Sequence, residues 1–297
     1  MRSRLDRRRH GRVFPKPAGG VDERDDFAVV SHGVAMIKTW SNDMNEGTTI
    51  TFLGVSCCIP NVGLDSACFL INGRHLVDTG WGSLDRMRRY GFEPLDLESI
   101  IFTHLHHDHY LGLPHLLFYL GLRRRPAEKP IKIIGPSQDV EKVAILADEF
   151  LQISRYPELK IEREIIGLNS GGEYSIDGMK LTAFEVKHSS SVSSPIQALA
   201  YKLVDEKAGV TLVFTGDTHF YPPVADFARG SALLIHDGVH TPPAEAAEIA
   251  RRAGVGKLAL IHFDCEKTDE VLAGARGVFP MTFAPKEGET IRLTRGV

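Results

Sequence analysis

The sequence predicts an α/β fold, in which strands and helices alternate along most of the chain. Short apolar segments rich in Val, Ile and Phe recur between turn residues, which is typical of strands. Longer segments with apolar residues three to four positions apart lie between them, which is typical of helices that cover a sheet. In addition, each half shows the same order of elements: strand hairpins, then a strand, a histidine and a helix.

We expect two parts in the 297 residues: a basic tail and approach segment over residues 1–45, and a folded domain over residues 46–297. Residues 1–16 hold seven basic side chains and one acidic one, a net charge of +6. Because the whole chain carries −3, the remainder carries −9. A body of that charge disfavours general polyanion binding, and the basic run is predicted to be a solvated tail rather than a nucleic-acid contact. Residues 27–30 and 34–37 are expected either to form short strands or to pack against the folded domain.

The first half of the domain should contain four strands before its histidine-rich motif. A turn at Asn72-Gly73 joins two of them in a hairpin, and Asp78-Thr79-Gly80 ends the second. Asp78 then has two readings: it orients a ligand of the motif, or it caps the next helix. Strands are expected at 49–53, 67–71, 75–78, 99–102 and 131–136. Helices are expected at 83–90, from the end of the motif to about residue 122, and at 140–153.

The second half should repeat this pattern with more hairpins. Turns are expected at Gly171-Gly172, Asp177-Gly178 and around Gly209, and Gly254 should end a helix. Strands are expected at 161–166, 172–176, 180–187, 196–204, 210–214, 231–235, 257–261, 281–284 and 290–293, and helices at 243–253 and 269–276.

The motif Thr-His-Leu-His-His-Asp-His at residues 103–109 follows an apolar strand directly. His104 and His106 are two apart, so they leave an extended chain on the same side, while Asp108 and His109 follow where a helix should begin. Such groups at the end of a buried strand need a partner, and a divalent cation is the simplest common one. Imidazole with carboxylate favours zinc, iron or manganese over calcium or magnesium. His107 points away from His106 and is expected not to be a ligand.

This motif resembles the metal-binding signature of the metallo-β-lactamase superfamily, and the resemblance extends over roughly residues 48–294. It implies an αβ/βα sandwich, with two facing mixed β-sheets flanked by helices and metals at one edge. It also implies one metal on His104, His106 and His188, a second on Asp108, His109 and His262, and Asp217 bridging the two. Taken alone, His188 and His262 would more often be hydrogen-bonded core or loop histidines. The expected cofactors are two divalent ions, Zn²⁺ first, with Mn²⁺ or Fe²⁺ as alternatives.

The segments 111–114, 214–218 and 260–263 resemble the ribonuclease Z and phosphodiesterase branch of that superfamily. In this branch a His-acid pair and a later His form the proton-donating apparatus, which the resemblance places at His236-Asp237 and His240. It implies Asp237 as the residue that orients His240, and His240 as the general acid, with Asp108 also at the catalytic centre. His236 is an alternative donor, or a strand-end histidine with a local hydrogen bond.

The resemblance implies a dinuclear hydrolase, a phosphodiesterase that uses a metal-bridging hydroxide as nucleophile on a small or nucleotide-like substrate. A tRNA 3′-end endonuclease of the ribonuclease Z type is the second reading, with the basic tail or Arg123–Arg125 gripping the RNA. Two departures disfavour nucleic acid as partner: residues 57–64 contain no Lys or Arg where those enzymes have a basic loop, and only 28 residues separate His188 from Asp217, where they usually carry a long arm. A lactone or thioester hydrolase and a metal-holding scaffold without turnover remain further alternatives.

Location and assembly are less constrained. Four cysteines without zinc-ribbon spacing suit a reducing compartment, so the cytoplasm is expected. No apolar run approaches the roughly twenty residues needed to cross a bilayer, and no apolar segment follows Arg7–Arg9 as in an export signal. We therefore expect no membrane partner, and a homodimer is one assembly left open.

Overall fold

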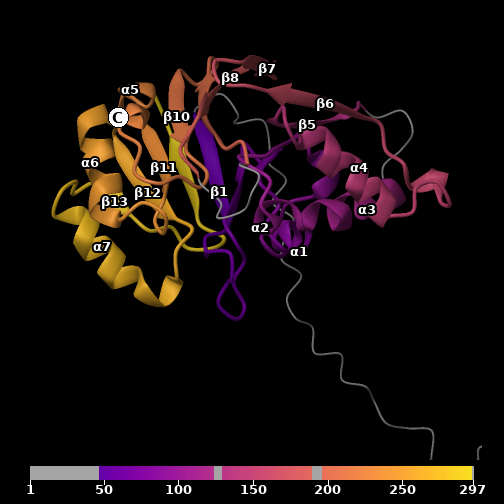
Figure 1. Ribbon diagram of the computed structural model, residues 1–297, viewed down its shortest axis with the longest axis horizontal. Coiled ribbons are helices and arrows are strands. Elements are labelled where there is room, and N and C mark those ends of the chain that lie inside the picture. The colour runs from indigo at the N-terminus through magenta and orange to yellow at the C-terminus, as the bar shows by residue number, and fades with distance from the viewer. Residues whose placement is uncertain (1–46, 124–128, 189–195, 296–297) are drawn as a thin grey trace, which may run out of the picture. The chain divides into compact units, whose positions relative to one another are not determined.

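Two seven-stranded mixed β-sheets face each other in the computed structural model, which describes residues 47–123, 129–188 and 196–295 (Figure 1). The expected αβ/βα sandwich, the metallo-β-lactamase fold, is therefore confirmed. The predicted basic tail, the segments 27–30 and 34–37, and Arg124 and Arg125 lie outside the described residues.

The first sheet has the order β14-β1-β2-β3-β4-β5-β6. Its strands are antiparallel from β14 to β3 and parallel from β3 to β6. Asn72 and Gly73, both with positive φ, form the predicted turn between β2 and β3. The strands are β1 Thr48–Gly54, β2 Cys68–Ile71, β3 His75–Val77, β4 Ser99–Ile101, β5 Ile131–Pro136, β6 Arg163–Leu168 and β14 Thr290–Leu293.

The second sheet has the order β13-β12-β11-β10-β9-β8-β7 and the same layout. It is antiparallel from β7 to β10 and parallel from β10 to β13. The order of elements that recurs in the two halves of the sequence thus corresponds to two sheets of the same layout. The strands are β7 Glu173–Ile176, β8 Met179–Glu185, β9 Leu199–Asp205, β10 Val210–Phe214, β11 Leu233–Asp237, β12 Lys257–Ile261 and β13 Thr282–Phe283.

Helices cover the outer face of each sheet (Figure 1). The first group is α1 Ser83–Arg89, η1 Pro94–Asp96, α2 His107–Tyr110, α3 Gly112–Arg123, α4 Val140–Phe150 and η2 Pro157–Leu159. The second group is α5 Pro223–Phe227, α6 Pro243–Ala253, η3 Cys265–Lys267 and α7 Thr268–Arg276. No helix in the described ranges is long and apolar enough to span a bilayer.

Three apolar cores hold these four layers together. The central core lies between the sheets and includes Phe52, Phe69, Tyr201 and Phe214, all nearly fully buried. A second core joins the first sheet to α1, α3 and α4, and a third joins the second sheet to α5, α6 and α7. The central strands β2, β4 and β11 are buried along their whole length, so they read as apolar runs whose polar residues lie at their ends.

Several predicted bounds differ from the structure by one to three residues, and three differences concern α4, α5 and β11. Helix α4 ends at Phe150 rather than residue 153, because the chain turns at Gln152, whose φ is +52°. Helix α5 was not predicted, since its five residues begin at a proline pair that reads as a turn. Strand β11 continues through His236 and Asp237, two residues beyond the predicted end.

Candidate metal centre

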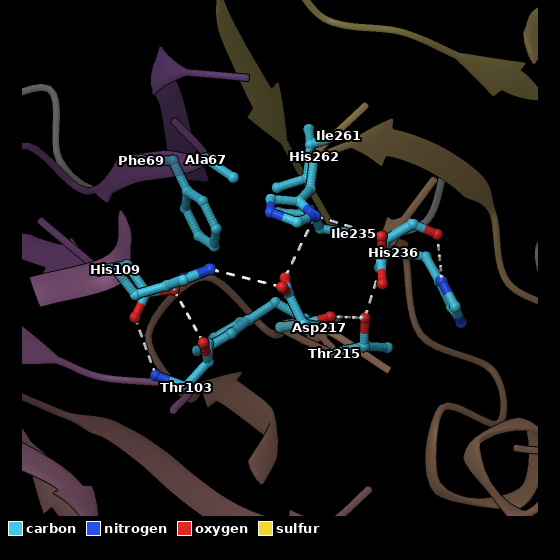
Figure 2. A pocket seen from close by; sticks show the side chains of 14 residues that line it. Ala67, Phe69, Thr103, His109, Thr215, Asp217, Ile235, His236, Ile261 and His262 are labelled. Carbon is cyan, nitrogen blue, oxygen red and sulfur yellow. Dashed lines mark hydrogen bonds and ion pairs between the residues drawn. The ribbon is translucent and has the colours of Figure 1, made fainter. Parts of the chain in front are cut away.

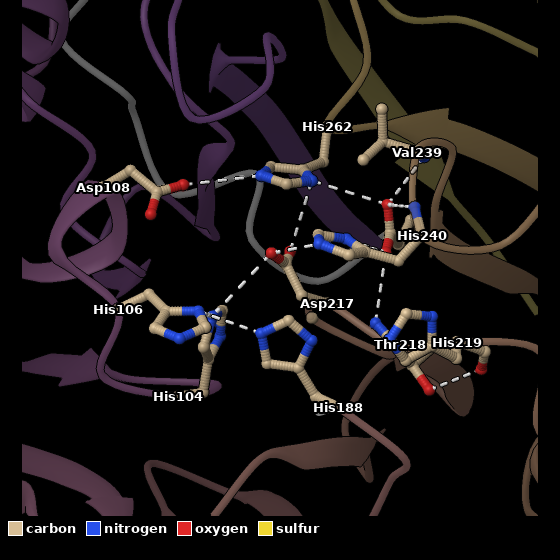
Figure 3. A network of polar contacts seen from close by, with 12 residues as sticks. His104, His106, Asp108, His188, Asp217, Thr218, His219, Val239, His240 and His262 are labelled. Carbon is tan, nitrogen blue, oxygen red and sulfur yellow. Dashed lines mark hydrogen bonds and ion pairs between the residues drawn. The ribbon is translucent and has the colours of Figure 1, made fainter. Parts of the chain in front are cut away.

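The candidate ligands meet at one edge of the two sheets, on the loops that follow β4, β8, β10 and β12 (Figure 3). The motif after β4 comes from the first sheet, and the remaining ligand candidates come from the second. Parallel and antiparallel strands of both sheets end there, so that side chains far apart in sequence converge while the sheets stay packed.

Three imidazoles form the first cluster. The Nδ1 atom of His106 lies 3.1 Å from Nε2 of His104 and 2.9 Å from Nε2 of His188. His104 and His188 are buried and His106 is half-buried. Their ring nitrogens lie close enough together to share one cation, as expected from the sequence.

Asp108, His109 and His262 form the second cluster, and all three are buried. The Oδ2 atom of Asp108 lies 3.2 Å from Nε2 of His109 and 3.4 Å from Nε2 of His262. His262 has a φ of +60°, which is uncommon for a residue with a side chain and marks backbone held in place by its surroundings.

Asp217 lies between the two clusters. Its Oδ2 is 3.8 Å from Nε2 of His104 and 3.6 Å from Nε2 of His109, and its Oδ1 is 3.4 Å from Nδ1 of His262. Gly216, with a φ of +57°, allows this approach, because a Cβ there would lie 2.5 Å from Cβ of Thr103. The structure therefore brings together all seven side chains that the sequence singled out as ligands.

Asp78 orients the motif and does not cap a helix. It accepts hydrogen bonds from the backbone N–H and the hydroxyl of Thr103 at 2.9 and 2.8 Å, and its Oδ2 lies 2.9 Å from Nδ1 of His109. Helix α1 begins after Gly82 without a side-chain cap of its own. A carboxylate on Nδ1 fixes the ring of His109 with Nε2 toward the cluster, which is the usual support of a metal-binding imidazole.

A small cavity of about 20 Å³, lined by both polar and apolar side chains, lies between the sheets next to Asp217 and His262 (Figure 2). His236 lines it and is fully buried, with Nδ1 2.9 Å from the carbonyl oxygen of Asp237. Burial lowers the pKa of His236. This matches the reading of His236 as a strand-end histidine with a local hydrogen bond, because a buried neutral ring cannot reach a substrate.

Asp237 and His240 form a pair at the mouth of the centre. The Nδ1 atom of His240 lies 2.8 Å from Oδ2 of Asp237, and the carboxylate also accepts the backbone N–H groups of Thr218 and Val239 at 3.1 and 2.8 Å. The hydrogen bond to Asp237 raises the pKa of His240, whose side chain is 27% exposed. Burial would raise the pKa of Asp237, but the hydrogen bond from His240 and the His262 ring, whose Nδ1 lies 3.4 Å from Oδ1 of Asp237, lower it below its usual range.

The charge of the centre suits bound cations. Four buried carboxylates, Asp78, Asp108, Asp217 and Asp237, have imidazoles, hydroxyls and backbone amides as their described partners. Burial lowers the pKa of His188 to about 4 and holds that of His104 well below its usual value, which favours the neutral rings that bind a metal. Nε2 of His109 and Nδ1 of His262 are buried and make no hydrogen bond among the described residues.

Comparison with known proteins decides the family. The model of the Beta-lactamase superfamily domain matches residues 74–263, a range that contains all seven candidate ligands together with Asp237 and His240. The chain is a metallo-β-lactamase superfamily protein.

The chain is related to ribonuclease Z at about 27% identity. Ribonuclease Z of Methanothermobacter thermautotrophicus is 27% identical over an alignment of 304 positions, which spans 82% of this chain and 96% of that protein. The solved metallo-β-lactamase fold protein YhfI from Bacillus subtilis superposes with a TM-score of 0.69 at 22% identity, over 83% of this chain and all of that one. The short form of human tRNase Z gives 0.63 at 19% identity, over 82% and 98%. The chain is thus a hydrolase of this superfamily, with histidine and aspartate clusters that suit a dinuclear site.

The metal centre also contains residues that the sequence analysis did not single out. The hydroxyl of Ser66 donates a 2.7 Å hydrogen bond to the carbonyl oxygen of Asp108. His219 lies beside the clusters, with its ring centroid 6.3 Å from that of His188 and 5.7 Å from that of His240. Its position directly after Asp217-Thr218 was the available signal, whereas nothing in the sequence pairs Ser66 with Asp108.

Proposed function

We propose that this protein is a metal-dependent phosphodiesterase acting on small or nucleotide-like phosphodiesters. One observation carries the proposal: the two clusters of metal-binding side chains share the Asp217 carboxylate. The Asp237–His240 pair lies directly beside that carboxylate, with His240 Nδ1 3.7 Å from Asp217 Oδ2. Hydrolysis of a phosphodiester needs both charge neutralisation at phosphorus and a proton for the leaving oxygen.

The proposed ligands are His104, His106 and His188 for one ion and Asp108, His109 and His262 for the other, with Asp217 common to both. Zn²⁺ is the first choice because imidazole and carboxylate are its usual ligands, with Mn²⁺ and Fe²⁺ as alternatives. When bound, such a pair of ions supplies an activated water and stabilises negative charge on the phosphoryl oxygens. Asp78 holds the His109 ring through Nδ1 and keeps its Nε2 directed to the centre.

His240 is the proposed general acid. Asp237 holds its Nδ1 and favours the protonated ring, which leaves the proton on Nε2 for transfer. As the water oxygen forms its bond to phosphorus, the ester P–O bond breaks and the leaving oxygen takes that proton. His240 thus acts on the leaving group, and Asp237 acts only through His240.

Ribonuclease Z-type cleavage of tRNA 3′ ends is the second candidate, because the relative from Methanothermobacter thermautotrophicus carries that name. The described chain between Ile196 and Asp217 is accounted for by the β9–β10 hairpin, so it offers no long arm there. A tRNA substrate would require steeply salt-dependent binding, which filter binding at two salt concentrations measures.

A substrate panel tests the proposal directly. Nitrophenyl phosphodiesters, nitrophenyl phosphomonoesters and lactones are compared on one purified sample whose transition-metal content is also measured. We expect diesters to turn over fastest, with activity lost on chelation and restored by Zn²⁺. Turnover of carbon esters alone, or full activity in a sample free of transition metal, would contradict the proposal. The cytoplasmic location, the homodimer and the domain boundary near residue 46 stay predictions.

A further inference from the structure

Four exposed apolar side chains lie on loops that carry or contact ligands of the candidate centre. We call Ile59, Val62, Trp81 and Val239 the apolar rim. Ile59 is 78% exposed, Val62 is fully exposed, and the other two are about half exposed. Large apolar groups held in water at a site, rather than scattered singly, indicate a binding surface.

The loop of residues 57–64, which contains Ile59 and Val62, rises from the ligands themselves. At its start, the backbone N–H of His262 donates to the carbonyl oxygen of Val55 at 2.8 Å. At its end, the hydroxyl of Ser66 donates to the carbonyl oxygen of Asp108 at 2.7 Å. Both ends of the loop are therefore fixed to the backbone of the second cluster, so the loop begins and ends at the centre.

Further contacts hold this loop in one shape. The Nδ2 atom of Asn61 donates to Oδ1 of Asp264 at 3.3 Å, two residues beyond His262. The guanidinium of Arg86 donates to the carbonyl oxygen of Gly63 at 2.8 Å, and it is itself buried and paired with Glu287 at 3.0 Å. A loop ordered before binding loses little conformational entropy when a ligand arrives, so its apolar tip is prepared to contact one.

The other rim residues are tied to the same centre. The backbone N–H of Trp81 donates to Oδ1 of Asp65 at the end of the loop, at 2.9 Å. Val239 precedes His240, donates its N–H to Oδ1 of Asp237, and lies beside His240 and His262 in Figure 3.

The chemistry of the loop is uncharged. Residues 57–64 contribute no Lys or Arg, so this side of the centre offers no counter-ion for a second phosphate group. An apolar surface without cations is complementary to an uncharged ester arm. A polynucleotide would place its next phosphate on the rim, where residues 57–64 provide no Lys or Arg to pair with it.

We propose that the apolar rim binds an uncharged alkyl or aryl arm of the substrate, so that the preferred substrate is a small amphiphilic phosphodiester. This inference rests on the proposed phosphodiesterase function. It assigns Ile59 and Val62 to substrate selection, and they have no part in the bond-breaking step.

Equilibrium binding tests the inference independently of turnover. Diphenyl phosphate and dimethyl phosphate are titrated calorimetrically into the zinc-loaded protein, because both are diesters and only their arms differ. We expect diphenyl phosphate to bind at least about tenfold more tightly, since two apolar side chains that cover a ring contribute about threefold to fivefold each. Absence of diphenyl phosphate binding, or equal affinity for the two diesters, would overturn the proposal.

Variants locate the effect. In Ile59→Ser/Val62→Ser, diphenyl phosphate affinity should fall about tenfold, while dimethyl phosphate affinity should change less than about twofold. Ile145→Ser is the matched control, because Ile145 is 51% exposed on helix α4. An unchanged diphenyl phosphate affinity in the double variant, or a change only in its oligomeric state by light scattering, would show that the rim serves another partner. If the proposed function fails, no diester turns over, yet the binding preference can still be measured.

Discussion

Replacement of His240 by Ala tests the proton-donating role most directly. His240 holds a 2.8 Å hydrogen bond to Asp237 and lies 3.7 Å from the shared Asp217, at the exposed side of the centre. A positioned general acid contributes about 10²–10⁴-fold to rate. Because the His240 side chain is 27% exposed and water can partly replace it, we expect the lower half of that range. The loss should be about 10²–10³-fold, or about 3–4 kcal/mol of transition-state stabilisation, for a diester with an alkyl leaving group.

The assay compares two leaving groups on the same variant. A nitrophenolate departs as an anion and needs no proton, so His240→Ala should slow a nitrophenyl diester by less than about fivefold. His107→Ala is the control, because His107 belongs to the same motif but is exposed and its tilted ring contacts Tyr110. Metal content is measured on all proteins. Equal slowing of both substrates at unchanged metal content would refute the role of His240 as the acid.

Three further predictions concern metal, packing and pH. Asp217→Asn should reduce bound zinc, measured by mass spectrometry, below the about two equivalents expected of the loaded protein, and should lower kcat/KM by at least about a hundredfold. Retention of both ions would contradict its shared position. Phe214→Ala should cost about 4 kcal/mol of unfolding free energy in urea, since Phe214 is 1% exposed and packs on Phe69 and Tyr201 in the central core; a loss under about 1 kcal/mol would count against this core. Burial lowers the pKa of His75 to about 4, so the unfolded state binds the proton more tightly and stability falls as pH falls from about 6.5 towards 4. With metal removed by a chelator, the unfolding free energy of the wild type should fall by about 2 kcal/mol more than that of His75→Asn between pH 6.5 and 4.5. Parallel curves of unfolding free energy against pH for the two proteins would refute this.

Local sequence predicted the parts of this centre that depend on strand ends. His104 and His106 follow an apolar strand with a two-residue spacing, and the structure places both in one cluster. The hairpin at Asn72-Gly73 was equally predictable, because positive φ at both positions is a local property of those residues.

Contacts between distant segments could not be predicted in this way. The buried group of Asp65, Arg86 and Glu287 holds the loop beside the centre, yet Asp65 and Glu287 are 222 residues apart. Whether Asp78 caps a helix or orients His109 was also open, because both roles require only a carboxylate after a strand. Three-dimensional proximity to Thr103 and His109 decides it.

The pairing of β14 with β1 has a consequence for synthesis of the chain. Thr51 and Thr290 share a 2.8 Å hydrogen bond across a separation of 239 residues. While the ribosome is still translating, β1 therefore presents an open edge, which is the kind of edge on which chains aggregate. The first sheet cannot be completed until β14 has left the exit tunnel, so this edge stays uncovered for most of the time that the chain is being synthesised.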